Sequence, residues 1–379
     1  MKWSLRRPSV ALAALAAVAI SAATIPQALS VVPPKGGEAV KTRFATESLL
    51  LTVARAGKRM VAVGEYGNVV LSDDDGKTWR QAKRVPSTIT LTSVFFIDDK
   101  TGWTVGHDTL VLTTGDGGET WTKQFGGGES DNALLSVYFK DAQHGWAVGA
   151  FNYTIETTDG GKNWVERKTL VPPSSTATAS GAAAPAADFD PTASTQPKPG
   201  ADPYAAATGD ENHLNSMFAG PDADTLFVAA EAGAVYRSLD GGTTWQKVLS
   251  GYIGSFWGGL TAKDGTIYVT GMRGNIWKST DKGASWTKLD TAAADQSVSG
   301  GVQLADGSFV FVGLGGQVLY STDGTKFTLT YRADRKGLNS VIQDGETLYV
   351  FGEGGVKAQS PTPKPEEIET PLPPAEGGG

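Results

Sequence analysis

Ser72-Asp-Asp-Asp-Gly-Lys-Thr-Trp79 is the first of six copies of one eight-residue pattern, which we call the Asp box. The later copies are Thr114-Gly-Asp-Gly-Gly-Glu-Thr-Trp121, Thr157-Thr-Asp-Gly-Gly-Lys-Asn-Trp164, Ser238-Leu-Asp-Gly-Gly-Thr-Thr-Trp245, Ser279-Thr-Asp-Lys-Gly-Ala-Ser-Trp286 and the shortened Ser321-Thr-Asp-Gly-Thr-Lys-Phe327. Their closing aromatic residues lie 42, 43, 81, 41 and 41 residues apart, and the 81 is one period plus an insertion. A repeat of this length is typical of a radial or solenoid array.

Each Asp box belongs to a longer unit of predicted strands. In one unit, alternating apolar residues bounded by turn residues predict strands at 91–97, 103–106, 110–114 and 120–125. The same order recurs at 49–83, 134–168, 214–248, 256–289, 298–332 and 338–361, and the last unit keeps only three strands. Seven units of antiparallel strands predict an all-β fold, a seven-bladed β-propeller with Asp-box repeats over residues 38–361.

The seventh unit needs a fourth strand to match the others. Residues 38–47 precede the first unit, and we expect them to supply that strand and close the ring. A six-bladed ring with a frayed end is the alternative.

The Asp boxes are predicted to be structural. Each aspartate sits in the turn between the third and fourth strands, where it can accept backbone N–H bonds while nearby glycines permit positive φ. Each closing aromatic residue is expected to pack between neighbouring blades. Six equivalent copies around a ring are not six active sites. The aspartates are Asp74, Asp116, Asp159, Asp240, Asp281 and Asp323, and the aromatic residues are Trp79, Trp121, Trp164, Trp245, Trp286 and Phe327.

Residues 1–30 have the pattern of a signal peptide. Lys2, Arg6 and Arg7 precede an apolar core at 10–20, and small residues follow. The apolar core is shorter than the roughly 20 residues that a spanning helix needs. This pattern predicts export to the periplasm, with retention of the segment as a membrane anchor as the alternative. The chain has no cysteine, which excludes disulfides and thiolate chemistry.

Two segments are expected to lie outside the ring and to be disordered. Residues 170–210 are rich in Ala, Pro, Ser and Thr and separate the third and fourth units, and residues 362–379 form a Pro- and Gly-rich tail. The formal net charge of -7 argues against a nucleic-acid partner, for which a basic surface would be expected.

The sequence contains no constellation that favours a reaction. Arg84-Val-Pro86 resembles a sialidase motif but follows the first Asp box instead of preceding it, which indicates a chance match. A glycosidase needs two carboxylates facing each other across the sugar. Glu65, Asp108, Glu156, Glu231 and Glu353 are loop acids that we interpret as solvated side chains.

The three histidines, His107, His144 and His213, lack metal-ligand spacing. We therefore assign no catalytic, cofactor-binding or metal-binding residues and expect no small-molecule cofactor.

Two segments resemble the photosystem II stability/assembly factor family. They are Gly102-Trp-Thr-Val-Gly106 and His144-Gly-Trp-Ala-Val-Gly149, each followed by an Asp box. The resemblance implies a seven-bladed, non-enzymatic propeller that binds membrane-protein subunits during complex assembly. The family's arginine patch does not transfer to positions here. Similar proteins occur beside exporters of the resistance–nodulation–division class. The resemblance therefore implies that this chain is an accessory factor for an envelope complex and is peripheral to the membrane.

Loops that join strands two to three, and those that join consecutive blades, share one face of a propeller. We expect the partner to dock on that face, because exposed aromatic, Met and Arg side chains are typical interface anchors. The candidate residues are Phe151, Tyr153, Met272, Arg273, Arg84, Arg332 and Arg335. Two further functions stay open: a secreted carbohydrate-active propeller, and a permanent transporter subunit.

Overall fold

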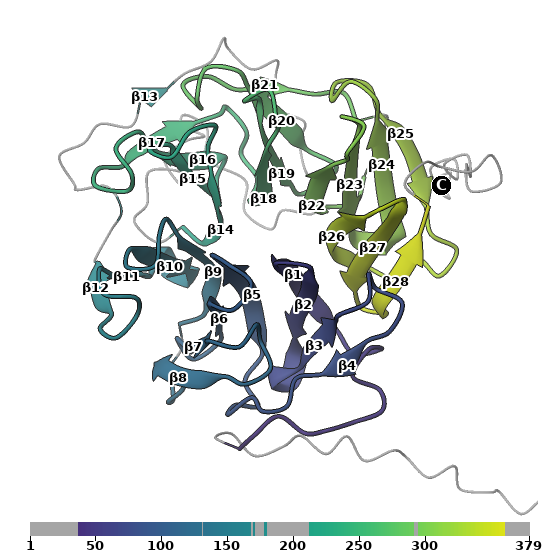
Figure 1. Cartoon of the computed structure of the whole chain (residues 1–379). Coiled ribbons are helices and arrows are strands. Elements are labelled where there is room, and N and C mark those ends of the chain that lie inside the picture. Colours follow the sequence, from purple (N-terminus) through teal and green to yellow (C-terminus); the bar gives the residue numbers. More distant parts are fainter. Residues whose placement is uncertain are drawn as a thin grey trace, which may run out of the picture. The chain divides into compact units, whose positions relative to one another are not determined.

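Seven small antiparallel sheets surround a common centre in this computed structural model (Figure 1). The structure describes residues 37–130, 132–167, 170, 178–179, 212–291 and 295–360, which all belong to one compact unit. The predicted all-β, seven-bladed propeller is confirmed, and the six-bladed alternative is wrong. The signal segment 1–30 and the tail 362–379 lie outside the described residues.

Each blade is built from consecutive strands. Blade 1 contains β1 (Leu50–Ala56), β2 (Arg59–Gly64), β3 (Val69–Ser72) and β4 (Arg80–Gln81). Blade 2 contains β5 (Leu91–Phe96), β6 (Gly102–Gly106), β7 (Val111–Thr114) and β8 (Thr122–Phe125). Blade 3 contains β9 (Leu134–Phe139), β10 (Gly145–Gly149), β11 (Thr154–Thr157) and β12 (Val165–Arg167). Blade 4 contains β14 (Leu214–Ala219), β15 (Leu226–Ala230), β16 (Ala234–Ser238) and β17 (Gln246–Leu249), with β13 (Thr178–Ala179) added at its outer edge. Blade 5 contains β18 (Phe256–Thr261), β19 (Ile267–Gly271), β20 (Ile276–Ser279) and β21 (Thr287–Lys288). Blade 6 contains β22 (Val298–Gln303), β23 (Phe309–Gly313), β24 (Gln317–Ser321) and β25 (Thr328–Tyr331). Blade 7 contains β26 (Leu338–Asp344), β27 (Thr347–Gly352) and β28 (Gly355–Gln359).

The first strand of every blade lies nearest the centre of the ring (Figure 1). Single 3-10 turns follow the second strand in three blades, at Glu65–Gly67, Ala150–Asn152 and Leu314–Gly316. Since the turn after strand two and the connection after strand four lie at the same end of each sheet, they share one face of the ring, as the sequence predicts.

The apolar core is divided into seven clusters, and each cluster lies between two neighbouring blades. Between blades 1 and 2, for example, Val61 and Leu71 pack with Leu91 and Trp121. Burial of apolar surface therefore holds blade against blade, whereas hydrogen bonds hold the strands within a blade.

The ring closes through packing between blades 7 and 1. Trp79 lies edge-on to Phe351, with ring centroids 5.6 Å apart. Tyr349 donates a hydrogen bond of 2.8 Å to the carbonyl of Asp75, and the Asn339 side chain donates to the carbonyl of Leu50 at 3.1 Å.

The prediction that residues 38–47 add a fourth strand to the seventh blade is wrong. These residues form no strand, and blade 7 has three. The chain instead turns locally, because the Phe44 carbonyl accepts bonds from the N–H groups of Glu47 and Ser48. Only the Thr46 carbonyl reaches β28, where it accepts the Val356 N–H at 3.1 Å.

Three residues of the predicted insertion 170–210 belong to the described part of the chain, Leu170, Thr178 and Ala179. Leu170 is buried between blades 3 and 4, and β13 pairs in parallel with β17 at the edge of blade 4. The remaining residues of the insertion lie outside the described part of the chain. No helix among the described residues is long and apolar enough to cross a membrane.

Candidate functional site

The aspartate of each Asp box is fully engaged within its own turn. In the first box, Asp74 accepts the Thr78 N–H at 2.8 Å and the Thr78 hydroxyl at 2.7 Å, while the Ser72 hydroxyl accepts the Gly76 N–H at 2.9 Å. The next four boxes repeat this pattern, except that the side-chain amide of Asn163 replaces the hydroxyl donor in the third box. In the shortened sixth box, Asp323 accepts the N–H groups of Thr325 and Lys326 instead.

These hydrogen bonds lower the pKa of every Asp-box carboxyl. For Asp74 and Asp159, the largest cause is the bond from a backbone N–H, that of Thr78 and Asn163 respectively. For Asp116, Asp240 and Asp281, burial acts to raise the pKa but the hydrogen bonds outweigh it. The carboxylates are therefore held ionised by the turn itself and have a structural role.

The closing aromatic residues lie between blades. Trp245 of blade 4 packs with Trp146 of blade 3, and Trp286 of blade 5 packs with Phe227 of blade 4. The same arrangement places an aromatic ring in six of the seven interfaces, including Phe327 between blades 5 and 6. Blade 7 has no Asp box, and its cluster with blade 6 contains no closing aromatic residue of this kind.

The loop acids that a glycosidase would need serve another purpose. Glu65, Glu231 and Glu353 occupy equivalent positions after the second strand of blades 1, 4 and 7. Each accepts the backbone N–H of the residue just before the first strand of its own blade, Leu49 at 3.0 Å, His213 at 2.9 Å and Gly337 at 2.9 Å. These carboxylates thus fix the entry to the inner strands.

The remaining acids and the histidines form no catalytic cluster. Glu156 is paired with Arg167 at 2.9 Å, and His144 is paired with Asp141 in a surface turn at 2.9 Å. In the part of the chain that the structure describes, no group of three or more His, Cys, Asp or Glu side chains is arranged to hold a metal ion.

Phe151 is the most prominent candidate for partner contact on the predicted face. It lies at the centre of the turn Ala150–Asn152 with φ of 53°, and 56% of its surface is exposed. Its ring stands edge-on to the ring of His213, with centroids 4.9 Å apart. An aromatic side chain held outward by a tight turn pays little entropy on binding. Tyr153, by contrast, is half-buried and packs on the core between blades 2 and 3.

Met272 and Arg273 occupy the corresponding turn of blade 5. Met272 is 38% exposed, and Arg273 has φ of 55°. The backbone of this turn is braced, because the Met272 carbonyl accepts the Tyr252 hydroxyl at 3.0 Å and the Asn275 side chain at 2.8 Å.

Arg332 and Arg335 lie in the connection between blades 6 and 7. Arg332 is paired with Asp334 at 3.3 Å and donates to the Gln359 side chain at 2.9 Å. Arg335 stacks over the ring of Tyr331, 4.2 Å from its centroid. Phe151, Met272 and these arginines thus belong to separate local clusters around the ring, so their joint role as a partner face stays a prediction.

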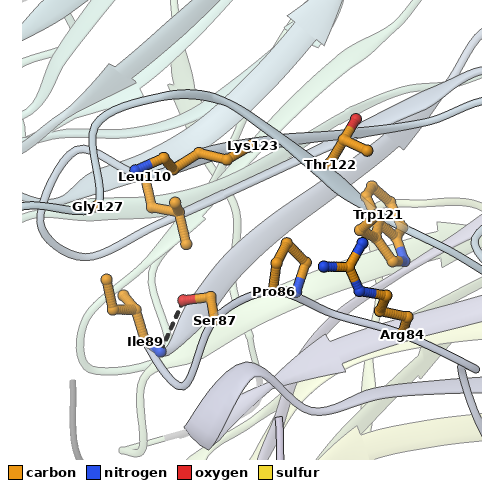
Figure 2. Close-up of a pocket in the computed structure, with 9 residues that line it drawn as sticks. All are labelled: Arg84, Pro86, Ser87, Ile89, Leu110, Trp121, Thr122, Lys123 and Gly127. Atoms are coloured by element: carbon orange, nitrogen blue, oxygen red, sulfur yellow. Dashed lines mark hydrogen bonds between the residues drawn. The ribbon is translucent and has the colours of Figure 1, made fainter. Parts of the chain in front are cut away.

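Arg84 lines a pocket of about 250 Å³ at the outer rim, between the connection from β4 to β5 and strand β8. Figure 2 shows Arg84 and Pro86 beside Trp121, with Ile89 below Leu110. Arg84 is paired with Glu38 at 2.7 Å. None of the nine lining residues is acidic, so the pocket offers cationic and apolar contacts.

Sequence reasoning missed this pocket. Lys123 and Leu110 belong to blade 2, whereas Arg84 and Pro86 follow blade 1, so only the folded ring brings them together. The Arg84-Val-Pro86 segment was the one available signal, since a proline after the fourth strand indicates a rigid connection.

Comparison with known proteins agrees with this architecture. A family model described as photosynthesis system II assembly factor YCF48 matches residues 127–179. A structure of YCF48 bound to a D1 peptide superposes with a TM-score of 0.59 at 16% identity, over 86% of this chain and 96% of that one. The chain is thus similar to YCF48 in its propeller fold. YCF48 from Cyanidioschyzon merolae is also similar, with a TM-score of 0.56 at 16% identity over 83% and 96% of the two chains.

The propeller fold of this chain also occurs in an enzyme. Virginiamycin B lyase from Staphylococcus aureus superposes with a TM-score of 0.62 at 12% identity, over 85% of this chain and 97% of that one. At such identities the likeness shows the fold alone. A search of curated proteins gives no match to the sequence.

Proposed function

We propose that this chain is a non-catalytic protein-binding propeller that assists the assembly or operation of a membrane protein complex. The observation that carries the proposal is the similarity to YCF48, one structure of which holds a D1 peptide. The matched segment 127–179 contains β9 to β13 and includes the turn that presents Phe151. Protein binding also suits a ring in which Glu65, Glu231 and Glu353 are committed to the backbone of their own blades.

The proposed docking face is the one that carries the turns after the second strands. Phe151 and Met272 are both exposed there, on turns whose backbones are fixed by hydrogen bonds. Rigid exposed apolar side chains are the anchors around which protein interfaces form. Arg273 adds a cation beside Met272, which suits a partner with an acidic rim.

The proposed compartment is the periplasm, and the proposed partner is an integral complex of the envelope. The signal-like pattern of residues 1–30 supports export. An exporter of the resistance–nodulation–division class is the partner class that we put first, with peripheral attachment of the propeller to the membrane.

An affinity pull-down of the tagged full chain from solubilised envelope membranes tests this function. We expect a membrane protein to be retained stoichiometrically and to be lost when Phe151→Ser, Met272→Ser and Arg273→Ser are combined. Val165→Ser is the matched control, because Val165 is 62% exposed but lies on the outer strand β12. Retention of no membrane protein by the unaltered chain would overturn the proposal.

A further inference from the structure

Blade 7 differs from the other six in its outer part. Among the described residues, it is the only blade without a fourth strand, so β28 lies at its outer edge (Figure 1). In every other blade the third strand is covered by a fourth, from two residues long in β4 and β21 to four in β8, β17 and β25. The place of one short strand is thus open in blade 7.

The backbone of β28 offers hydrogen bonds at this place. The N–H of Val356 points away from β27, because it donates to the Thr46 carbonyl. Along an antiparallel strand, the backbone N–H and carbonyl groups of successive residues point to alternate sides, so those of Ala358 point to the same side as those of Val356. Within the described residues, the N–H and carbonyl of Ala358 and the carbonyl of Val356 have no strand partner on that side. Three backbone groups are therefore available to an added strand.

A strand is already added to another blade of this molecule. In blade 4, β13 pairs with the outer edge of β17, with Thr178 opposite Val248 and Ala179 opposite Leu249. This pairing is parallel and comes from outside the regular four-stranded unit. Blade edges of this ring thus accept extended chain segments.

Two exposed lysines lie at the Gly354 end of the open edge, and the exposed Glu47 lies beside Gly355. Lys336 and Lys357 meet beside Gly354, where a Cβ atom would lie 2.9 Å from Lys336 Cδ and 3.7 Å from Lys357 Cε. Both lysines are exposed, and neither makes an ion pair with another described residue. Of the nearby acids, Asp334 is paired with Arg332, and Glu353 holds the Gly337 N–H. Burial acts to raise the pKa of Asp334, but Arg332 and Lys336 outweigh it and lower that pKa.

We propose that the open edge of β28 binds an extended, acidic segment of a partner protein as the fourth strand of blade 7. The partner's backbone pairs with the Val356 carbonyl and with the N–H and carbonyl of Ala358, and its carboxylates meet Lys336 and Lys357. Edge strands are natural templates for strand addition, in which backbone bonds give affinity and side chains give specificity. The proposal rests on the protein-binding function proposed above and locates one contact of it.

The test uses a fluorescein-labelled peptide, Glu-Val-Glu-Val-Thr-Val-Glu, and its counterpart with lysine in place of each glutamate. We expect the acidic peptide to bind the full chain in fluorescence anisotropy and to slow hydrogen exchange at the Ala358 amide. The lysine peptide is expected to bind at least tenfold more weakly. Equal binding of both peptides, or binding without protection of Ala358, overturns the proposal.

Two substitutions separate the backbone from the charge contribution. Ala358→Pro removes the donor, and proline is tolerated where an edge N–H faces solvent, so the variant is expected to fold. We expect affinity to fall roughly five- to tenfold, in line with the loss of one backbone hydrogen bond. Lys357→Glu is expected to weaken binding by about tenfold, whereas Lys288→Glu on the outer strand of blade 5 leaves it unchanged. Unchanged affinity in both edge variants contradicts the proposal.

The chain's own tail is the competing occupant. Glu366, Glu367 and Glu369 follow the end of β28 in sequence. If replacing all three with lysine raises the affinity for the acidic peptide tenfold, the tail occupies the edge and the partner strand is overturned; unchanged affinity supports it.

The pull-down described above keeps the two proposals distinguishable. A membrane protein retained equally by the unaltered chain and by Ala358→Pro supports the function and overturns the edge site. Peptide binding at the edge without a retained membrane protein supports the edge site and contradicts the function.

Discussion

The indole N–H distinguishes residues that are otherwise equivalent in this ring. Trp245 and Trp286 close their Asp boxes with 5% and 6% exposure. The Trp245 N–H donates to the Gly242 carbonyl at 3.0 Å, whereas the Trp286 N–H has no partner among the residues that the structure describes. The same motif therefore buries both tryptophans in the same way, but the local turn geometry decides whether the indole N–H finds a carbonyl.

We expect Trp245→Phe to destabilise the protein more than Trp286→Phe, by about 1 kcal/mol. Both changes remove similar buried area, but only the first leaves a carbonyl without its donor. Urea unfolding, followed by circular dichroism so that loss of a fluorophore does not matter, gives the two free energies. Equal losses, or a larger loss in Trp286→Phe, would show that the hydrogen bond contributes nothing.

At the scale of the strand, the recurring glutamate fixes where the first strand of a blade begins. Glu65, Glu231 and Glu353 each accept one backbone N–H at that point. The other blades hold the same end without a glutamate, since His107, Ala150, Met272 and Leu314 follow the second strand there. The backbone bond between the two segments, as from Ala150 N–H to the Ala133 carbonyl, is common to all.

We expect Glu231→Ala to cost about 1 kcal/mol of unfolding free energy and Glu231→Gln to retain most of it, because the amide oxygen still accepts the His213 N–H. Glu346→Ala, at an exposed turn of blade 7, is the control and should leave stability unchanged. Thermal and urea unfolding measure the effect. A loss in Glu231→Gln as large as in Glu231→Ala would point to charge, not to the hydrogen bond.

At the scale of the elements, the sequence predicts the strands correctly where the apolar pattern is periodic. The strands predicted at 91–97, 103–106, 110–114 and 120–125 correspond to β5 to β8 within two residues, because alternation and Asp-box turns mark both ends. The sequence did not reveal that residues 38–47 turn back on themselves. That outcome depends on local carbonyl bonds at Phe44, and a strand-like composition does not encode them.

For the whole molecule, the six Asp boxes give the ring a common response to acid. Hydrogen bonds hold the pKa of each of the six carboxyls below its ordinary value. A group with a lowered folded pKa stabilises the protein above its unfolded value of about 3.9. That contribution disappears as the pH falls through the lower folded pKa.

We therefore expect the unfolding free energy to be nearly constant from pH 7 to about pH 5 and to fall steeply below about pH 4. Asp240→Asn, which cannot titrate, should be less stable at pH 7 and should show a shallower fall, since one of six carboxyls is removed. Urea titrations at a series of pH values give both curves. Parallel curves would exclude Asp240 from the acid response.

The candidate site was less predictable than the ring, because it depends on which blades lie side by side. Arg84 and Lys123 lie on different blades yet line one pocket. Phe151 and His213 also belong to different blades, and their rings are in contact. Exposure of Phe151 was foreseeable from its place in a turn, whereas the inward packing of Tyr153 two residues later follows from the core between blades 2 and 3.

Because each blade is made from consecutive strands, the chain could begin at any blade and still form the same ring. Joining the ends and reopening the chain between any two blades would leave each sheet's internal hydrogen bonds intact, so circular permutants are expected to fold. The segment between β12 and β14 lies at one of these junctions. The longest connection between two blades thus lies where a new terminus, or an inserted domain, would interrupt no sheet.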